Sequence, residues 1–120
     1  MSDYYKEILN TTPDGEVLQL QELTISMSDK EASAIFNIVN SYDNLICFKM
    51  RSPAIHGLIH DEQYIVISDI HLKSHQVVFV HKVKDDWYFV EDGRGKSSDR
   101  YHYYKCDQWD GLIKCLEDIL

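Results

Sequence analysis

The second half of the chain contains two strongly strand-forming segments that a short polar run separates. Residues 75–83 and 87–92 are rich in valine and aromatic residues, and the polar run Lys84-Asp85-Asp86 separates them. This pattern predicts a β-hairpin. In its first strand, the odd-numbered residues from Val77 to Val83 share one face, and the even-numbered residues share the other.

Four further segments show apolar patterns that favour strands. Residues 45–50 are largely apolar on both faces, which favours a central strand over an edge strand. Residues 63–72 are rich in β-branched side chains, and residues 101–105 read YHYYK. In residues 16–27 the alternation changes phase, which predicts two short strand pieces or a bulge.

Three segments have the spacing of amphipathic helices. Residues 3–10 place two tyrosines, an isoleucine and a leucine on one helical face before a run that ends helices. Residues 28–41 begin with S-x-x-E, the capping-box pattern, and continue with an apolar stripe. Residues 107–119 carry a second stripe, with Asp107 as the expected N-cap.

Together these elements predict an α+β fold. We expect an antiparallel sheet of about five strands with the helices at 28–41 and 107–119 packed on one face. The 120 residues fit a single domain, 1–120, and a composition of 44% hydrophobic residues is enough to build its core.

The charge balance narrows the classes of partner. The chain has 20 acidic and 12 basic residues, for a net charge of -8. Nucleic acids and anionic membranes are bound by clustered lysine and arginine, so we expect neither as a partner. An acidic surface instead attracts a basic protein partner through long-range electrostatics.

Cysteine usage and hydropathy predict a reduced, cytoplasmic protein without a membrane span. The three cysteines are odd in number and form no C-x-x-C motif, which argues against a disulfide scaffold. We identify no secretory leader and no apolar run near the ~20 residues that a membrane helix needs.

A basic loop follows the predicted hairpin and contains G-K-S, the end of a P-loop motif. The P-loop also needs a glycine where this chain has Val90, and it needs a helix where this chain predicts a strand. We therefore expect no nucleotide site here. The loop residues Arg94, Lys96 and Arg100 remain candidates for binding an anion or an acidic partner.

The six histidines predict no metal site. His56 and His60 are four residues apart, as are His71 and His75, which on a helix would suit zinc. Both pairs lie in predicted loops or strands, where that spacing does not bring the rings together. We expect neither a metal nor another cofactor.

One arrangement points to catalysis. A histidine at the head of a strand, a turn and then Trp-Tyr-x-x-x-Asp resembles the histidine-bearing hairpin of papain-like cysteine peptidases, including ubiquitin-specific proteases. The resemblance implies that His75 is the general base and that Asp92 orients it. Cys106, at a predicted helix start, would be the nucleophile in a permuted order.

Two function classes remain open. The first is a small acidic protein-binding module, an inhibitor or adaptor of a basic partner. It would act through its acidic surface or through the aromatic residues Tyr101, Tyr103 and Tyr104. The alternative is a papain-like cysteine hydrolase. The lack of a complete catalytic motif favours the first class, and the sequence predicts no oligomeric state.

Overall fold

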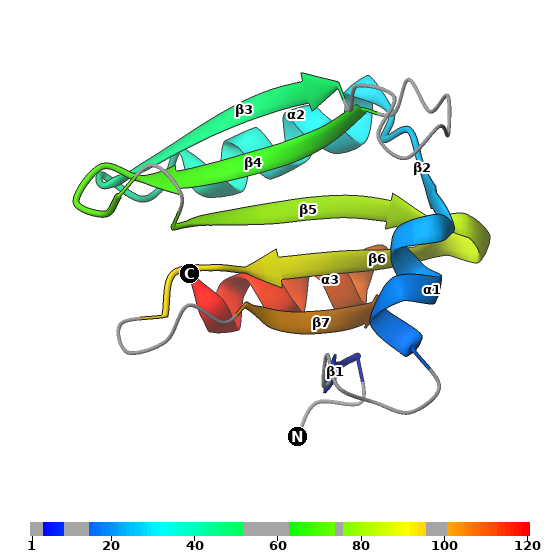
Figure 1. The fold of residues 1–120 in the computed structure, drawn as a ribbon. Coiled ribbons are helices and arrows are strands. Elements are labelled where there is room, and N and C mark those ends of the chain that lie inside the picture. Colours follow the sequence, from blue (N-terminus) through cyan, green and yellow to red (C-terminus); the bar gives the residue numbers. More distant parts are fainter. Residues whose placement is uncertain (1–3, 9–14, 52–62, 74–75, 96–100) are drawn as a thin grey trace.

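The computed structural model describes residues 4–8, 15–51, 63–73, 76–95 and 101–120, with the backbone alone described at Arg51. Within them, an antiparallel sheet of seven strands carries three helices, so the predicted α+β class is confirmed with a larger sheet than expected (Figure 1). The strands are β1 (Tyr5–Ile8), β2 (Thr24–Ile25), β3 (Leu45–Arg51), β4 (Gln63–Asp69), β5 (Val77–Val83), β6 (Trp87–Asp92) and β7 (His102–Asp107), and the helices are α1 (Glu16–Glu22), α2 (Asp29–Val39) and α3 (Gln108–Ile119).

The strand order is β1-β7-β6-β5-β4-β3, with β2 paired to β5. Helices α2 and α3 lie on one face of the sheet, and α1 lies on the other (Figure 1). The expectation that α2 and α3 share a face is confirmed. None of the described helices is long and apolar enough to cross a membrane.

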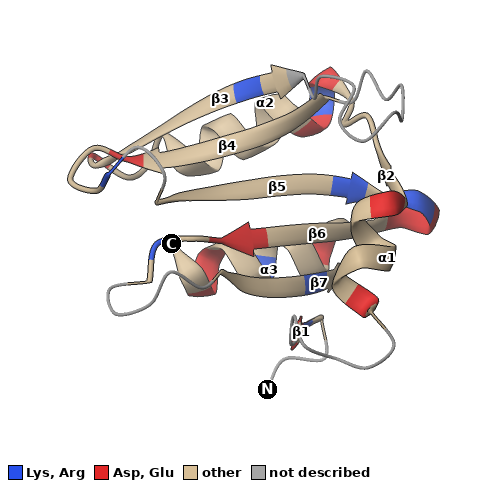
Figure 2. Cartoon of the chain, in the orientation of Figure 1, with Lys and Arg blue, Asp and Glu red and all other residues tan. Residues whose placement is uncertain are grey.

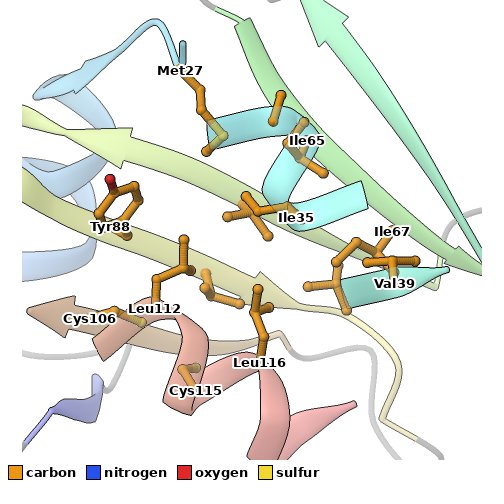
Figure 3. Close-up of a cluster of buried hydrophobic side chains, with 14 of the residues drawn as sticks. Met27, Ile35, Val39, Ile65, Ile67, Tyr88, Cys106, Leu112, Cys115 and Leu116 are labelled. Atoms are coloured by element: carbon orange, nitrogen blue, oxygen red, sulfur yellow. The ribbon is translucent and has the colours of Figure 1, made fainter. Parts of the chain in front are cut away.

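The main core lies between the sheet and helices α2 and α3. Figure 3 shows Ile35 of α2 and Leu112 of α3 directed toward the same layer of strand side chains. The fully buried residues of this layer include Ile65, Ile67, Val78, Val80, Val90 and Cys106. A smaller cluster on the opposite face joins α1 to the sheet through Ile8, Val17, Leu20, Val83 and Phe89.

The β5–β6 hairpin and the capped helix are confirmed. Val83 pairs with Trp87 across the 3₁₀ turn Lys84–Asp86. At the start of α2 the Glu31 backbone N–H donates to the Ser28 hydroxyl at 3.2 Å, and the Ser28 N–H donates to the Glu31 carboxylate at 3.1 Å. This reciprocal pair is the capping box that the sequence predicts.

Helix α3 begins as expected but without the expected cap. Asp107 occupies the N-cap position, yet its side chain makes no capping hydrogen bond. Its backbone N–H instead donates to the Tyr4 carbonyl at 2.8 Å, which joins the helix start to the beginning of β1. The helix lies against β1 so closely that a Cβ on Gly111 would be 2.4 Å from the Tyr4 carbonyl oxygen.

The helix predicted at residues 3–10 is wrong for the described part, which forms strand β1. Tyr5 pairs with Cys106 and Ile8 pairs with Tyr103 along the edge of β7. In a strand these two side chains point to opposite faces. Tyr5 accordingly packs on the α3 side, while Ile8 is buried beneath α1. Tyr5 and Ile8 therefore belong to different core layers. The same spacing would place them on one face of a helix, which is why the sequence pattern predicts a helix here.

The strand pieces predicted over residues 16–27 are wrong for residues 16–22, which form helix α1. Val17 and Leu20 lie on the buried side of this helix, and Leu18 lies on its exposed side. Because Leu18 is apolar although it is exposed, Leu18 and Leu20 show the two-residue spacing of a strand, and the sequence pattern therefore predicts strands here. Gly15 starts the helix in a left-handed conformation without a side-chain cap, so no capping signal marks the start in the sequence.

Candidate functional site

The sheet face opposite α2 and α3 is covered by α1 at one end and is otherwise uncovered by the described chain (Figure 1). We call the uncovered part the open face. Its side chains are mostly apolar or aromatic, and charged residues are sparse along the strands there (Figure 2). The open face is formed by Ile46, Phe48 and Met50 of β3, Tyr64 and Val66 of β4, Phe79 and His81 of β5, and Tyr101 and Tyr103 at β7.

Strand β3 supplies the most exposed part of this face. Ile46, Phe48 and Met50 are each 45% exposed, although each is a large apolar residue. The prediction of a central strand is wrong, because β3 pairs with β4 alone among the described strands and forms an edge. One of its apolar faces covers the core and the other faces outward. Contiguous exposed apolar side chains of this kind are typical of interaction sites.

Aromatic rings continue the open face from β4 to β7. Tyr64 stacks on His81 with 5.1 Å between ring centroids, and Phe79 lies 6.3 Å from Tyr101. Tyr101 in turn lies 6.2 Å from Tyr103. These separations fall within the range of favourable ring pairs. The rings therefore support one another in fixed positions and form a preordered apolar surface.

A hydrogen bond between His81 and Glu91 lies within the aromatic part of the face. His81 Nε2 is 2.9 Å from a Glu91 carboxylate oxygen, and the Gln21 side-chain amide donates to the other oxygen at 3.0 Å. Burial and the negative charge of Glu91 raise the pKa of Tyr103. Because the Glu91 carboxylate contacts both His81 of β5 and Gln21 of α1, it links α1 to the open face.

Gly93 explains part of the glycine-rich motif. A Cβ at this position would be 2.4 Å from Cε1 of the Tyr101 ring, which lies directly over the glycine backbone. The first glycine of G-R-G-K-S therefore allows Tyr101 to join the aromatic array. This role is structural and needs no phosphate.

The structure places the predicted basic loop only in part. The Arg94 guanidinium donates to the Asp92 carboxylate at 3.2 Å and to the Ile119 carbonyl at 2.5 Å, which ties β6 to the end of α3. Lys96 and Arg100 lie outside the described residues. Anion binding by this loop stays a prediction.

The three predicted tyrosines lie on two faces of the sheet. Tyr101 and Tyr103 belong to the open face, whereas Tyr104 packs against the main core on the α3 side. There, burial together with the charges of Glu7 and Asp92 raises the pKa of Tyr104 to about 12. The open face accordingly includes two of the three candidates.

A cavity of about 540 Å³ lies where the sheet meets the end of α3. Among its lining residues are Asp69, Asp92, Arg94, Tyr104 and Asp118. Asp69 accepts a hydrogen bond from the Asn44 amide at 2.9 Å, Asp118 accepts one from Tyr5 at 2.7 Å, and Asp92 pairs with Arg94. No group of three metal-ligating side chains occurs among the described residues. The carboxylates lining this cavity stabilise the fold.

The structure separates Cys106 and Asp92, two of the three residues of the proposed cysteine site. Cys106 is fully buried, and a hydrogen bond with Cys115, together with burial, raises the pKa of its thiol. Cys106 pairs with Tyr88 of β6, and Asp92 lies four residues further along the same strand, paired with His102. This spacing separates Asp92 from Cys106 by roughly 13 Å. His75 lies outside the described residues. A nucleophilic thiol needs the opposite properties: exposure and a lowered pKa.

Thiol labelling tests the chemistry of the three cysteines. In the native protein at pH 8 we expect Cys106 and Cys115 to react with iodoacetamide at least about a hundredfold more slowly than in denaturant, because both are buried. Cys47 is half-buried and should label first, although burial raises its pKa to about 12. Mass spectrometry of tryptic peptides gives the rate at each site. Fastest labelling at Cys106 would instead support the hydrolase hypothesis.

Comparison of the chain with protein-family models, curated proteins and solved structures gave no match.

Proposed function

We propose that this protein is a protein-binding module that docks a basic partner on its open face. The observation that carries the proposal is the exposed strip Ile46-Phe48-Met50 and its continuity with the aromatic array around Tyr64 and Tyr101. A monomer seldom leaves such a surface uncovered unless it binds something. Aromatic residues and methionine are also enriched at protein interfaces.

Charge favours a basic partner. Acidic residues border the open face at the end of α1 and at the hairpin turn (Figure 2). These positions include Glu22, Asp85 and Asp86. An apolar centre with a charged rim is the usual organisation of a protein interface, in which rim charges steer the approach of the partner. The net charge of -8 extends that attraction beyond the contact.

The size of the open face indicates a modest interface. Five strands spaced ~4.8 Å apart, each contributing ~20 Å of length, give a footprint of roughly 500 Å². A standard protein interface buries about 800 Å² on each partner. The open face of one chain therefore suits a transient contact or a short segment of the partner.

Affinity capture followed by binding of the purified partner tests this proposal. Tyr64→Ser and Tyr101→Ser each remove a ring from the open face, and we expect either to weaken binding of the captured basic protein about tenfold or more. Leu18→Ser is the matched control, because Leu18 is an exposed apolar residue on the outer side of α1. Isothermal titration calorimetry with the purified partner gives the dissociation constants.

Salt provides a second readout of the same binding. A basic partner steered by an acidic rim should bind more weakly as the salt concentration rises. A captured partner that is acidic, insensitive to salt and unaffected by both tyrosine substitutions would contradict the proposal.

A further inference from the structure

The two edge strands of the sheet, β1 and β3, differ in length and in the character of their side chains. Strand β1 has four residues and carries Lys6 and Glu7 in its middle. Strand β3 has seven residues, and its open-face side chains are Ile46, Phe48 and Met50. Short, charged edges resist pairing with other chains, whereas long apolar edges invite it. Among the described residues, β3 is thus the edge that is suited to accept another strand.

The hydrogen-bond alternation shows which backbone groups of β3 face outward. The Ile70 N–H donates to the Asn44 carbonyl at 2.9 Å, which makes residues 44 and 70 a hydrogen-bonded pair. In an antiparallel ladder such pairs recur at every second residue. Residues 46, 48 and 50 therefore direct their backbone groups toward β4, and Cys47 and Lys49 direct theirs to the outer edge.

We propose that a second copy of this chain pairs with this edge, β3 against β3 in antiparallel orientation around a two-fold axis. Phe48 is the middle residue of the strand, so a pairing centred on it overlaps all seven residues. Cys47 and Lys49 then exchange backbone hydrogen bonds with Lys49 and Cys47 of the second copy. These Cys47–Lys49 pairs contribute about four such bonds, and the pairing requires no change in β3.

The side chains are complementary in the same register. Phe48 faces the second copy's Phe48 as a non-hydrogen-bonded pair, the closer type, and Ile46 faces Met50. The six apolar residues form one strip across the axis, in which side chains that are 45% exposed in the single chain contact their neighbours side by side and keep their outward face open. Lys49 lies opposite a cysteine rather than a like charge, and its ammonium group is 3.6 Å from Asp29 of its own chain.

The dimer would also enlarge the docking surface. The two open faces join along the axis into one surface with about twice the area of a single open face. The pairing itself rests on the edge of β3 and does not depend on the proposed partner. Each chain carries a net charge of -8, so the dimer should strengthen as salt is added, the reverse of binding to a basic protein.

Disulfide trapping tests the register. In a Cys47→Ala background, Phe48→Cys places two thiols across the axis at a Cα separation of about 4.5 Å, which a disulfide spans. We expect a mild oxidant to cross-link this variant rapidly. Ile46→Cys alone should not cross-link, because its two copies lie roughly 14 Å apart. A mixture of Ile46→Cys and Met50→Cys chains should form the mixed disulfide, because these residues face each other.

Sedimentation equilibrium of the full chain tests the dimer without a cross-link. Phe48→Lys places two like charges opposite each other, and we expect the dimer dissociation constant to rise about tenfold or more. Leu18→Lys, at an exposed apolar position on α1, is the control and should leave it unchanged. Circular dichroism verifies that both variants fold. A wild-type chain that stays monomeric up to about 1 mM, or an Ile46→Cys variant that cross-links as fast as Phe48→Cys, would overturn the proposal.

Discussion

Replacing Phe89 by alanine is expected to lower the free energy of unfolding by about 3–5 kcal/mol, a large fraction of the total for a domain of this size. Phe89 is fully buried and stacks against Tyr103 with 5.9 Å between ring centroids. It fills the space between the sheet and the buried side of α1, which Val17 and Leu20 provide. Guanidinium unfolding followed by circular dichroism measures the loss as a lower midpoint.

The loss should be accompanied by local release of α1. A helix of seven residues is not stable by itself in water, so its amide protection depends on this contact. Hydrogen exchange in Phe89→Ala should therefore rise most at residues 16–22. The control, Leu18→Ala, truncates an exposed residue of the same helix and should cost less than about 0.5 kcal/mol. A small loss with α1 still protected would refute the assigned role of Phe89.

Elements whose signals lie within a few residues could be predicted from the sequence. The β5–β6 hairpin has a polar turn between two strand-forming runs, and α2 has its complete capping box at Ser28 and Glu31. Both signals are local, so they act in the same way whatever the rest of the chain does. The antiparallel α+β class followed from these elements and from the apolar stripe of α3.

The N-terminal elements could not be predicted, because distant contacts determine them. Residues 5–8 form a strand since β7, about 100 positions later in the chain, provides the backbone partners. Residues 16–22 form a helix since Phe89 and Val83 provide an apolar surface for Val17 and Leu20. The local pattern of each segment was ambiguous between helix and strand, and tertiary packing decided between them.

The sequence predicted two residues of the open face but not the exposure of that face. The sequence singled out Tyr101 and Tyr103, and it showed that β3 is apolar on both faces. It could not show that α2 covers just one of these faces, because the identity of an apolar residue does not reveal whether another element of the fold covers its side chain. The alternation of Phe79 and His81 was likewise visible, but their contact with Tyr64 depends on the register between strands.

Glu31 lies at the centre of a hydrogen-bond network that joins α2 to the sheet. Its carboxylate accepts from the Ser28 backbone N–H at 3.1 Å, from the Lys82 ammonium group at 3.1 Å and from the Tyr88 hydroxyl. Tyr88 in turn packs edge-on against Trp109 of α3, with 5.8 Å between ring centroids. Burial by itself would raise the pKa of Glu31, but the hydrogen bonds that it accepts outweigh burial and lower the pKa from 4.5 to about 2.

Glu31→Gln is therefore expected to destabilise the protein by about 2–3 kcal/mol at pH 7, because the folded state favours the carboxylate over the neutral acid. A lowered pKa gives stability that is fully present above pH 4.5 and is lost as the pH falls through about 2. The difference in unfolding free energy between wild type and Glu31→Gln should follow that course and nearly vanish near pH 2. Urea unfolding at each pH measures it.

The control substitution is Glu22→Gln, at an exposed position near the end of α1, which should change stability by less than about 0.5 kcal/mol at any pH. A Tyr88→Phe variant separates the charge from the cap, since it removes one donor and leaves the Ser28 and Lys82 contacts in place. If the network acts as a unit, the effects of Tyr88→Phe and Glu31→Gln will not add in the double variant. Additive effects, or a Glu31→Gln penalty that persists unchanged at pH 2, would show that packing rather than the carboxylate charge holds α2 to the sheet.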